Sequence, residues 1–311
     1  MRVAVIDIGT NSTRLLIADV RADGALTEVL RESTVTRLGD RVDASGRLAD
    51  DAMQRVLDTL DGYRATIDAR GIEATAAVLT SAARDADNGA EFTEQVRARY
   101  GIDARTIDGD EEAALTFAGA TSERPDDGTE IVVVDIGGGS TELVVGCDGE
   151  VHFHASTQAG VVRQTERHLH EDPPPPGGLR ALAEDAATVI AGAIPRELRE
   201  RVATGIAVAG TATSCAAIEL MLDPYDPKRV HGHTLALASL ELMLARLAQM
   251  TEEERRAVVG LHPDRAPTIV AGVVLMIETM RAFALERIEV SEHDILRGAA
   301  LRLAGPSISG W

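Results

Sequence analysis

Two segments of the chain share one pattern: a short apolar run, an Asp-x-Gly turn and a second apolar run. The first segment is VAVIDIGTNSTRLLIADV (residues 3–20), and the second is IVVVDIGGGSTELVVG (residues 131–146). Asp7 and Asp135 hold equivalent positions, as do Gly9 and Gly137. Continuous apolar runs on both sides of a glycine turn predict neighbouring strands of a buried sheet. The chain therefore contains an internal repeat, with one copy near the start of each half.

Helices and strands are expected to alternate in both halves. Apolar residues at intervals of three and four predict helices over 48–70 and 89–100, with a strand over 74–84 between them. The second half contains a strand over 205–209 that runs into a helix, and two long apolar helices over 235–250 and 267–283. We therefore expect an α/β fold with domains 1–126 and 127–311. The polar segment SERPDDGTE (122–130) is the expected hinge between them.

Charge and composition exclude several classes of partner. Fifty Asp and Glu against 31 Lys and Arg give a net charge of -19, which repels nucleic acid and anionic membrane surfaces. The longest apolar run, 269–277, is far below the roughly 20 residues that span a bilayer, and no secretion leader is visible. The two cysteines, Cys147 and Cys215, lie far apart in the sequence, as in proteins of reducing compartments. We therefore expect a cytoplasmic protein without nucleic-acid or membrane partners.

Three glycine-containing turns are candidate anion sites, because glycine lets backbone amides converge on a ligand. Taken singly, DIGTNS or DIGGGS is more often a plain hairpin turn, but two copies with an acidic residue at the same place favour phosphate binding. The third turn, AGTATS (209–214), is expected between a strand and a helix, with its amides at the helix N-terminus. The candidate phosphate ligands are Gly9, Thr10, Asn11, Ser12, Gly137, Gly138, Gly139, Ser140, Thr141, Gly210 and Thr211. Asp7 and Asp135 are candidate Mg²⁺ ligands, and a cleft between the domains is the expected phosphate site.

The order of these motifs resembles a known superfamily. DIGTNS, DIGGGST and GTATS are similar to the phosphate and adenosine loops of the acetate kinase, sugar kinase, Hsp70 and actin superfamily. With RLGDRVDASGRL, TSAARDADNG and GDEEAALTFAGA, they resemble more narrowly the exopolyphosphatase and guanosine pentaphosphate phosphohydrolase (Ppx/GppA) family, from the first residues to about Arg302. The resemblance implies two duplicated ribonuclease H-like (actin-like ATPase) domains with an interdomain cleft. Longer members carry a further HD-like C-terminal domain, which we do not expect here.

The resemblance also implies a reaction and its residues. The reaction is release of terminal phosphate from polyphosphate, with short chains expected, or from the 5′ end of guanosine pentaphosphate (pppGpp), with Mg²⁺ or Mn²⁺. Glu112 matches the family's catalytic base, and Glu142 matches a second carboxylate expected to act with Asp135 on the metal or on water. Arg84 matches a family arginine and is the first candidate for a phosphate fork. Without the resemblance, the acidic run that contains Glu111 and Glu112 would be interpreted as a helix start stabilised by the helix dipole. We keep that interpretation for Glu111.

Some alternatives stay open at this point. A kinase of the same superfamily would transfer the ATP γ-phosphoryl group to a small acceptor, and a binding module would hold polyphosphate or guanosine nucleotides without turnover. The histidine pairs His152/His154, His168/His170 and His231/His233 have a spacing that aligns both rings on one face of a strand, but no nearby cysteine supplies further zinc ligands. His231 in VHGH resembles a family loop position and is left without a role. The apolar helices over 235–250 and 267–283 form core or a homodimer surface, and core is the commoner case.

Overall fold

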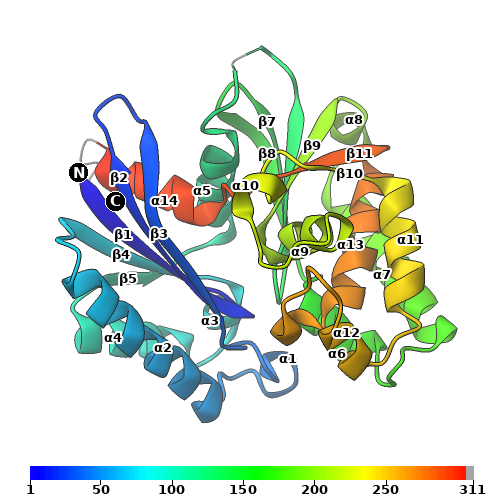
Figure 1. Ribbon diagram of the computed structural model, residues 1–311, viewed down its shortest axis with the longest axis horizontal. Coiled ribbons are helices and arrows are strands. Elements are labelled where there is room, and N and C mark those ends of the chain that lie inside the picture. Colours follow the sequence, from blue (N-terminus) through cyan, green and yellow to red (C-terminus); the bar gives the residue numbers. More distant parts are fainter. Residues whose placement is uncertain (126, 306–311) are drawn as a thin grey trace. The chain divides into compact units, whose positions relative to one another are not determined.

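The computed structural model describes residues 1–125 and 127–305 and divides into two compact units (Figure 1). Unit 1 comprises Met1–Gly119 and helix α14 (Ile295–Ala304), and unit 2 comprises Ala120–Asp294. The sequence-based division at 126/127 differs in one important respect, because it assigned α14 to the second domain. The last six residues of that expected domain, 306–311, lie outside the described residues.

Unit 1 is built on a five-stranded sheet of order β3-β2-β1-β4-β5. The strands β1, β2 and β3 are antiparallel, and β1, β4 and β5 are parallel. The elements are β1 (Arg2–Ile8), β2 (Ser12–Val20), β3 (Leu26–Val35), α1 (Val42–Ser45), α2 (Asp50–Asp68), β4 (Ala74–Leu79), α3 (Ser81–Asp85), α4 (Gly89–Tyr100), β5 (Asp103–Thr106) and α5 (Gly109–Thr121).

Both faces of this sheet are covered, which is why its central strands read as continuous apolar runs. Along β1, Ala4 and Ile6 pack in the cluster that contains α2 and α4. The alternate residues, Val3 and Val5, pack in the cluster that contains α14. Gly298 lets α14 approach α5, because a Cβ there would lie 1.8 Å from a backbone carbonyl oxygen of α5. The helix joins unit 1 through contacts between the two ends of the sequence, which local patterns do not report.

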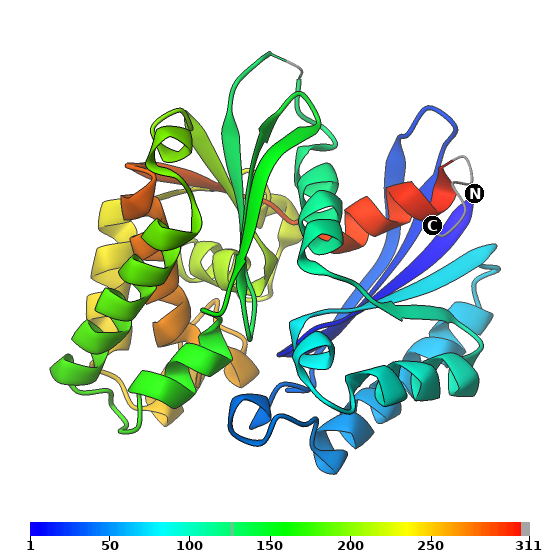
Figure 2. The same cartoon turned by 180° about the vertical axis from the view of Figure 1, so that it is seen from behind.

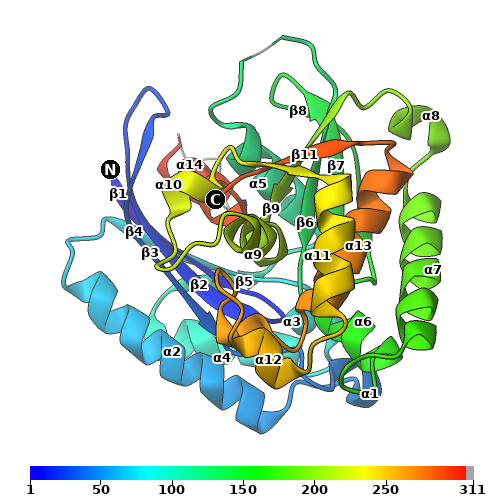
Figure 3. The same ribbon diagram turned by 45° about the vertical axis from the view of Figure 1, so that its right-hand side comes forward.

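Unit 2 is built on a six-stranded sheet of order β10-β11-β9-β6-β7-β8. Helices α7 and α13 pack side by side, green and orange in Figure 2, and α11 packs on α13 (Figure 3). The elements are β6 (Ile131–Ile136), β7 (Thr141–Cys147), β8 (Glu150–Thr157), α6 (Val161–His168), α7 (Pro176–Ala193), α8 (Arg196–Arg199), β9 (Thr204–Val208), α9 (Ala209–Glu219), α10 (Pro227–Val230), β10 (Thr234–Ala236), α11 (Leu237–Leu247), α12 (Glu252–Arg256), the 3-10 turn η1 (Pro263–Arg265), α13 (Ile269–Ala282) and β11 (Arg287–Val290).

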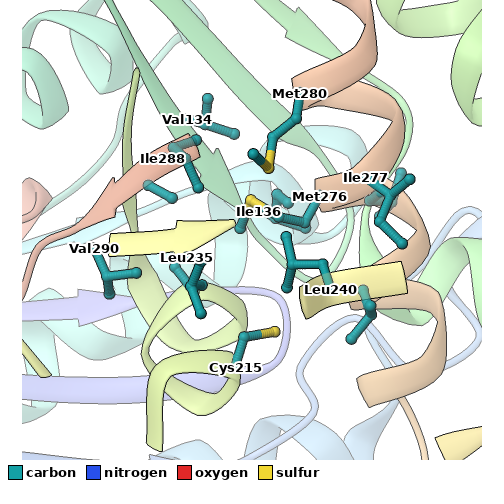
Figure 4. Close-up of a cluster of buried hydrophobic side chains, with 14 of the residues drawn as sticks. Val134, Ile136, Cys215, Leu235, Leu240, Met276, Ile277, Met280, Ile288 and Val290 are labelled. Atoms are coloured by element: carbon teal, nitrogen blue, oxygen red, sulfur yellow. The ribbon is translucent and has the colours of Figure 1, made fainter. Parts of the chain in front are cut away.

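The core of unit 2 lies between its sheet and these helices. Val134 and Ile136 of β6 face Met276 and Met280 of α13 (Figure 4), and all four are at most 2% exposed. Cys215 is fully buried in the same cluster, and burial raises the pKa of its thiol to about 12. Helix α13 is therefore core, which was the commoner of the two alternatives left open by the sequence. Cys215 is a small core residue, whereas Cys147 is only half-buried.

The predicted duplication is confirmed by strand order and by the turns. The order β3-β2-β1-β4-β5 of unit 1 recurs in unit 2 as β8-β7-β6-β9-β11. The Gly9 amide donates to the Ser12 carbonyl at 2.9 Å, and the Gly137 amide donates to the Ser140 carbonyl at 3.0 Å. The two strands of each copy are thus joined by a tight two-residue hairpin turn. The chain therefore has the duplicated, ribonuclease H-like α/β fold that the motifs indicated.

Several details of the fold differ from expectation. The strand expected over 74–84 ends at Leu79, and Arg84 lies in helix α3. The first residues of the helix expected over 235–250 form β10, and α11 ends at Leu247. The third strands, β3 and β8, were not predicted, because many of their residues are exposed or half-buried and form no apolar run. AGTATS is not a loop but the first turns of α9, which begins at Ala209 directly after β9. The chain reverses there through Ala209, whose φ of 60° lies in the left-handed region. None of the helices in the described part of the chain is long and apolar enough to cross a bilayer.

Candidate active site

The predicted site residues of unit 1 follow three neighbouring parallel strands. β1 pairs with β4, and β4 pairs with β5, so their carboxyl ends share the edge at which open α/β sheets bind ligands. The turn 9–12 follows β1, helix α3 with Arg84 follows β4, and helix α5 with Glu112 follows β5. The fold thus assembles at one edge three segments that are widely separated in the sequence.

Glu112 and Arg84 form an ion pair at this edge. Arg84 donates from Nη1 to Oε2 of Glu112 at 2.8 Å and to the Ile107 carbonyl at 3.3 Å. Glu112 is only 7% exposed, and burial raises the pKa of its carboxyl from 4.5 to about 7, against the opposing effect of Arg84. A carboxyl group with a pKa near neutrality is suited to accept a proton from water at physiological pH.

The neighbouring glutamate has a different environment. Glu111 accepts hydrogen bonds at Oε1 from Arg105 at 2.6 Å and from Arg302 at 2.9 Å. It therefore ties α14 to the start of α5, in addition to its favourable position near the helix N-terminus. Adjacent glutamates on one helix thus differ in environment, and Glu111 offers a matched control for Glu112.

The turn 9–12 is held by segments distant in the sequence. Oγ1 of Thr10 lies 2.7 Å from Oγ of Ser81, at the start of the helix that carries Arg84. The Thr10 carbonyl accepts the amide of Gly39 at 2.9 Å. A Cβ on Gly39 would lie 2.1 Å from the Thr10 methyl carbon, so this approach requires glycine. The turn is therefore held by two segments, the start of helix α3 at Ser81 and the segment that contains Gly39.

The turn 137–140 of unit 2 is supported in the same way. The Gly137 and Gly138 carbonyls accept the amides of Val161 and Val162, at 2.9 and 2.8 Å. A Cβ on Gly160 would lie 2.3 Å from the Gly138 carbonyl oxygen, which explains the glycine of the AGVV segment. The start of α9 is joined to this turn, since Thr211 donates from Oγ1 to the carbonyl of Ile136, the last residue of β6, at 3.2 Å. Unit 2 therefore brings its two predicted anion turns together.

The two copies differ in the residue that faces the repeated aspartate. In unit 1, Asp7 lies opposite Arg14 in the strand register, and Nε of Arg14 donates to Oδ2 of Asp7 at 2.8 Å. In unit 2, Asp135 lies opposite Glu142, and the two residues are 9% and 2% exposed. The duplicated hairpin thus carries an ion pair in one unit and a pair of carboxylates in the other.

The carboxylate pair of unit 2 fits a divalent cation. Like charges directly opposite each other in a sheet are destabilising, and a bound cation would offset the repulsion between Asp135 and Glu142. Carboxylate oxygens are suitable ligands for Mg²⁺ and Mn²⁺. Glu142 also accepts a hydrogen bond at Oε1 from Ser156 at 2.9 Å, which orients its carboxylate. Asp7, predicted as a third ligand, ion-pairs with Arg14 through Oδ2, and the metal-ligand roles of Asp7, Asp135 and Glu142 all stay predictions.

Sequence reasoning missed two arginines at these turns. Arg14 could have been found by aligning the two copies, because TR in the first stands where TE stands in the second. Arg265 lies over the start of α9, where a Cβ on Gly210 would lie 1.8 Å from its Nη1 atom. Nothing in the local sequence pattern marks Arg265, since η1 is far from α9 along the chain. A guanidinium beside an anion turn is a natural phosphate ligand.

Comparisons with known proteins place the chain in a family. Residues 16–304 match the model of the Ppx/GppA phosphatase family. The chain is 40% identical to exopolyphosphatase 2 of Mycobacterium tuberculosis, over 98% of this chain and 99% of that protein. A crystal structure of an exopolyphosphatase-like protein superposes with a TM-score of 0.89 at 34% identity, over 97% of this chain and 98% of the other. The Aquifex aeolicus Ppx/GppA member gives 0.81 at 32% identity, over 97% of each chain. The chain therefore belongs to the Ppx/GppA phosphatase family.

Proposed function

We propose that this protein is a metal-dependent exopolyphosphatase that releases terminal orthophosphate from inorganic polyphosphate, with short chains preferred. The observation that carries the proposal is the buried Glu112 carboxyl, paired with Arg84 and with a pKa near 7. The names of the similar proteins support the same activity. Hydrolysis of pppGpp at its 5′ end is the alternative for the same chemistry. We further propose Mg²⁺ as the metal and the cytoplasm as the location.

The proposed reaction is hydrolysis of a phosphoanhydride bond. Glu112 accepts a proton from the attacking water, whose oxygen forms a bond to the terminal phosphorus as the bridging P–O bond breaks. The products are orthophosphate and a chain shorter by one phosphate. Arg84 keeps Glu112 oriented through the 2.8 Å hydrogen bond, and its guanidinium offsets negative charge on the phosphoryl group.

Unit 2 contributes phosphate ligands and the metal ligands in this proposal. The amides of 137–141 and the start of α9 bind phosphate oxygens, and Arg265 adds a cation beside Gly210. Asp135 and Glu142 would hold the metal, which would neutralise charge on the phosphate oxygens when bound. Such local cations matter because the net charge of -19 opposes the approach of an anionic substrate.

The test is phosphate release by wild type, Glu112→Gln and Glu111→Gln, with and without Mg²⁺. The substrates are tripolyphosphate, long-chain polyphosphate, pppGpp and ATP. We expect metal-dependent release from polyphosphate, lowered about 10²-fold or more in Glu112→Gln and kept within a few-fold in Glu111→Gln. Equal losses in the two variants would contradict the role given to Glu112.

The same assay separates the alternatives. Release from pppGpp with none from polyphosphate would favour the guanosine pentaphosphate phosphohydrolase. Binding of polyphosphate without release from any substrate would favour a binding module. Consumption of ATP only when a small acceptor is supplied would favour a kinase.

A further inference from the structure

A second group of metal-ligating side chains lies within unit 2, separate from the Asp135 and Glu142 pair. It consists of His231, His293 and Glu123, whose ligand atoms all lie within 4.8 Å of one another. The two imidazole rings have centroids 4.3 Å apart, and Nδ1 of His293 lies 3.9 Å from Oε2 of Glu123. We propose that these three side chains form a binding site for a divalent transition-metal ion, Zn²⁺ in particular.

The backbone holds the two histidines in place. His231 ends the short helix α10, and the next residue, Gly232, donates its amide to the Val290 carbonyl at 2.8 Å. This ties the His231 segment to the end of β11. His293 lies in the loop that follows β11, and its amide donates to Oγ of Ser291 at 3.0 Å. Both histidines are thus anchored at the carboxyl end of the same strand.

Glu123 reaches the cluster from a third segment. It lies just after α5, in a turn where the Arg124 amide donates to the Thr121 carbonyl at 2.9 Å. The Arg124 side chain donates from Nη1 to Oε2 of Glu289, a residue of β11, at 3.2 Å. The residue next to Glu123 is therefore tied to the strand that positions both histidines. The cluster does not depend on a chance approach of long surface side chains.

The ligand set points to zinc more than to magnesium. Two imidazoles and one carboxylate form the protein ligand set of zinc sites that keep a position for water or substrate. Mg²⁺ prefers a shell of oxygen ligands, which the Asp135 and Glu142 pair resembles. Nδ1 of His231 lies 3.3 Å from the Glu292 amide nitrogen and 3.4 Å from Oγ of Ser291. Both contacts are long for hydrogen bonds, so they hold the imidazole only weakly against reorientation onto a metal ion.

The cluster lies beside the two segments that connect unit 2 to unit 1, which indicates a stabilising role for a bound metal. The chain passes from unit 1 to unit 2 at Gly119/Ala120 and returns at Asp294/Ile295. Glu123 lies just after the first passage and His293 lies just before the second. A metal ion bound to both and to His231 would fix the two connecting segments to the body of unit 2. We therefore expect bound Zn²⁺ to stabilise the native protein, as any ligand specific to the folded state does.

The test is Zn²⁺ binding to metal-free protein by isothermal titration calorimetry, in excess Mg²⁺ so that the other metal site is saturated. We expect one Zn²⁺ per chain and a rise in Tm. Glu123→Gln and His293→Gln should each weaken binding by at least about 100-fold and abolish the rise, because loss of a direct ligand should exceed the 10- to 100-fold effect of losing an outer partner. The control His262→Gln removes an exposed histidine that precedes the turn η1 and is not a member of the cluster, and this variant should bind Zn²⁺ as wild type does.

Several results would overturn the proposal. These are absence of Zn²⁺ binding by wild type, binding unchanged in both ligand variants, or equal weakening in the His262→Gln control. The Glu123 side chain is 57% exposed, so its substitution by Gln should not impair folding. Co²⁺ gives a second readout: we expect the strong visible absorption of a four- or five-coordinate ion, and the weak spectrum of an octahedral ion would contradict the site. None of these readouts depends on phosphatase activity.

Discussion

Replacing the proposed base by an isosteric amide should stabilise the protein at alkaline pH. Burial raises the pKa of Glu112 from 4.5 to about 7. A carboxyl group with a raised pKa in the folded state favours folding fully below pH 4.5 and loses that contribution as the pH rises to about 7. Above pH 7 the native state carries a buried negative charge that the unfolded chain solvates at no cost. Glu112→Gln removes this charge and keeps an oxygen to accept the hydrogen bond from Arg84.

The size of the effect follows from the shift. Each pKa unit corresponds to 1.36 kcal/mol, so the shift of Glu112 corresponds to about 3 kcal/mol in unfolding free energy above pH 7. Between pH 5 and pH 8.5, the variant should therefore gain about 2 to 3 kcal/mol of stability relative to wild type. The same variant is expected to lose phosphatase activity, so function and stability should change in opposite directions, as at other strained active sites.

Urea unfolding followed by circular dichroism, at several pH values from 5 to 8.5, measures this difference. Glu111→Gln is the control, since it breaks the ion pairs with Arg105 and Arg302 and should cost less than about 1 kcal/mol. The reasoning is refuted if Glu112→Gln is no more stable than wild type at pH 8.5, or if its advantage does not grow with pH.

Three further changes test the site. Arg84→Met removes a guanidinium that lowers the pKa of Glu112, so the midpoint of the rise in kcat/KM with pH should move above about 7; an unmoved midpoint would contradict Glu112 as base. Gly210→Ala should displace Arg265, because the added Cβ would overlap its guanidinium. We expect KM for polyphosphate to rise at least about tenfold, which corresponds to the loss of one charged hydrogen bond. An unchanged KM would exclude Arg265 as a phosphate ligand. Asp135→Asn should raise the Mg²⁺ concentration for half-maximal activity at least about tenfold, whereas wild-type Mg²⁺ dependence would refute its role as a ligand.

Much of the fold was predictable because its central strands are buried on both faces. β1, β2, β6 and β7 are apolar runs around the same Asp-x-Gly turn, and this pattern alone indicated a duplication. Helix α4 was predicted with its observed bounds. The exposed strands β3 and β8 have no such signal. The place of α14 depends on contacts across nearly the whole chain, which periodicity cannot report.

The site was predictable only where chemistry is local. The turns 9–12 and 137–140 could be predicted from the sequence because each has a glycine directly after an apolar strand. The pair Arg84 and Glu112 joins residues on different helices, so their hydrogen bond and the raised pKa of the carboxyl follow only from the parallel pairing of β4 with β5. In the cluster around His293, only His231 had a sequence signal, its spacing from His233, because the three members come from three separate segments.

The duplication explains how one hairpin serves two purposes. Both copies keep the aspartate, the turn and a glycine segment behind it, so the backbone is preserved. The difference is one side chain across the strand pair: Arg14 neutralises Asp7, while Glu142 doubles the charge of Asp135. Under the proposed function, the paired carboxylates of unit 2 are the metal ligands, because carboxylate oxygens suit Mg²⁺, and the Asp7–Arg14 ion pair is not required for the metal. Exchanging the partners tests this: Glu142→Arg should abolish the effect of Mg²⁺ while the fold persists, because Arg14 already occupies the equivalent place in the other copy.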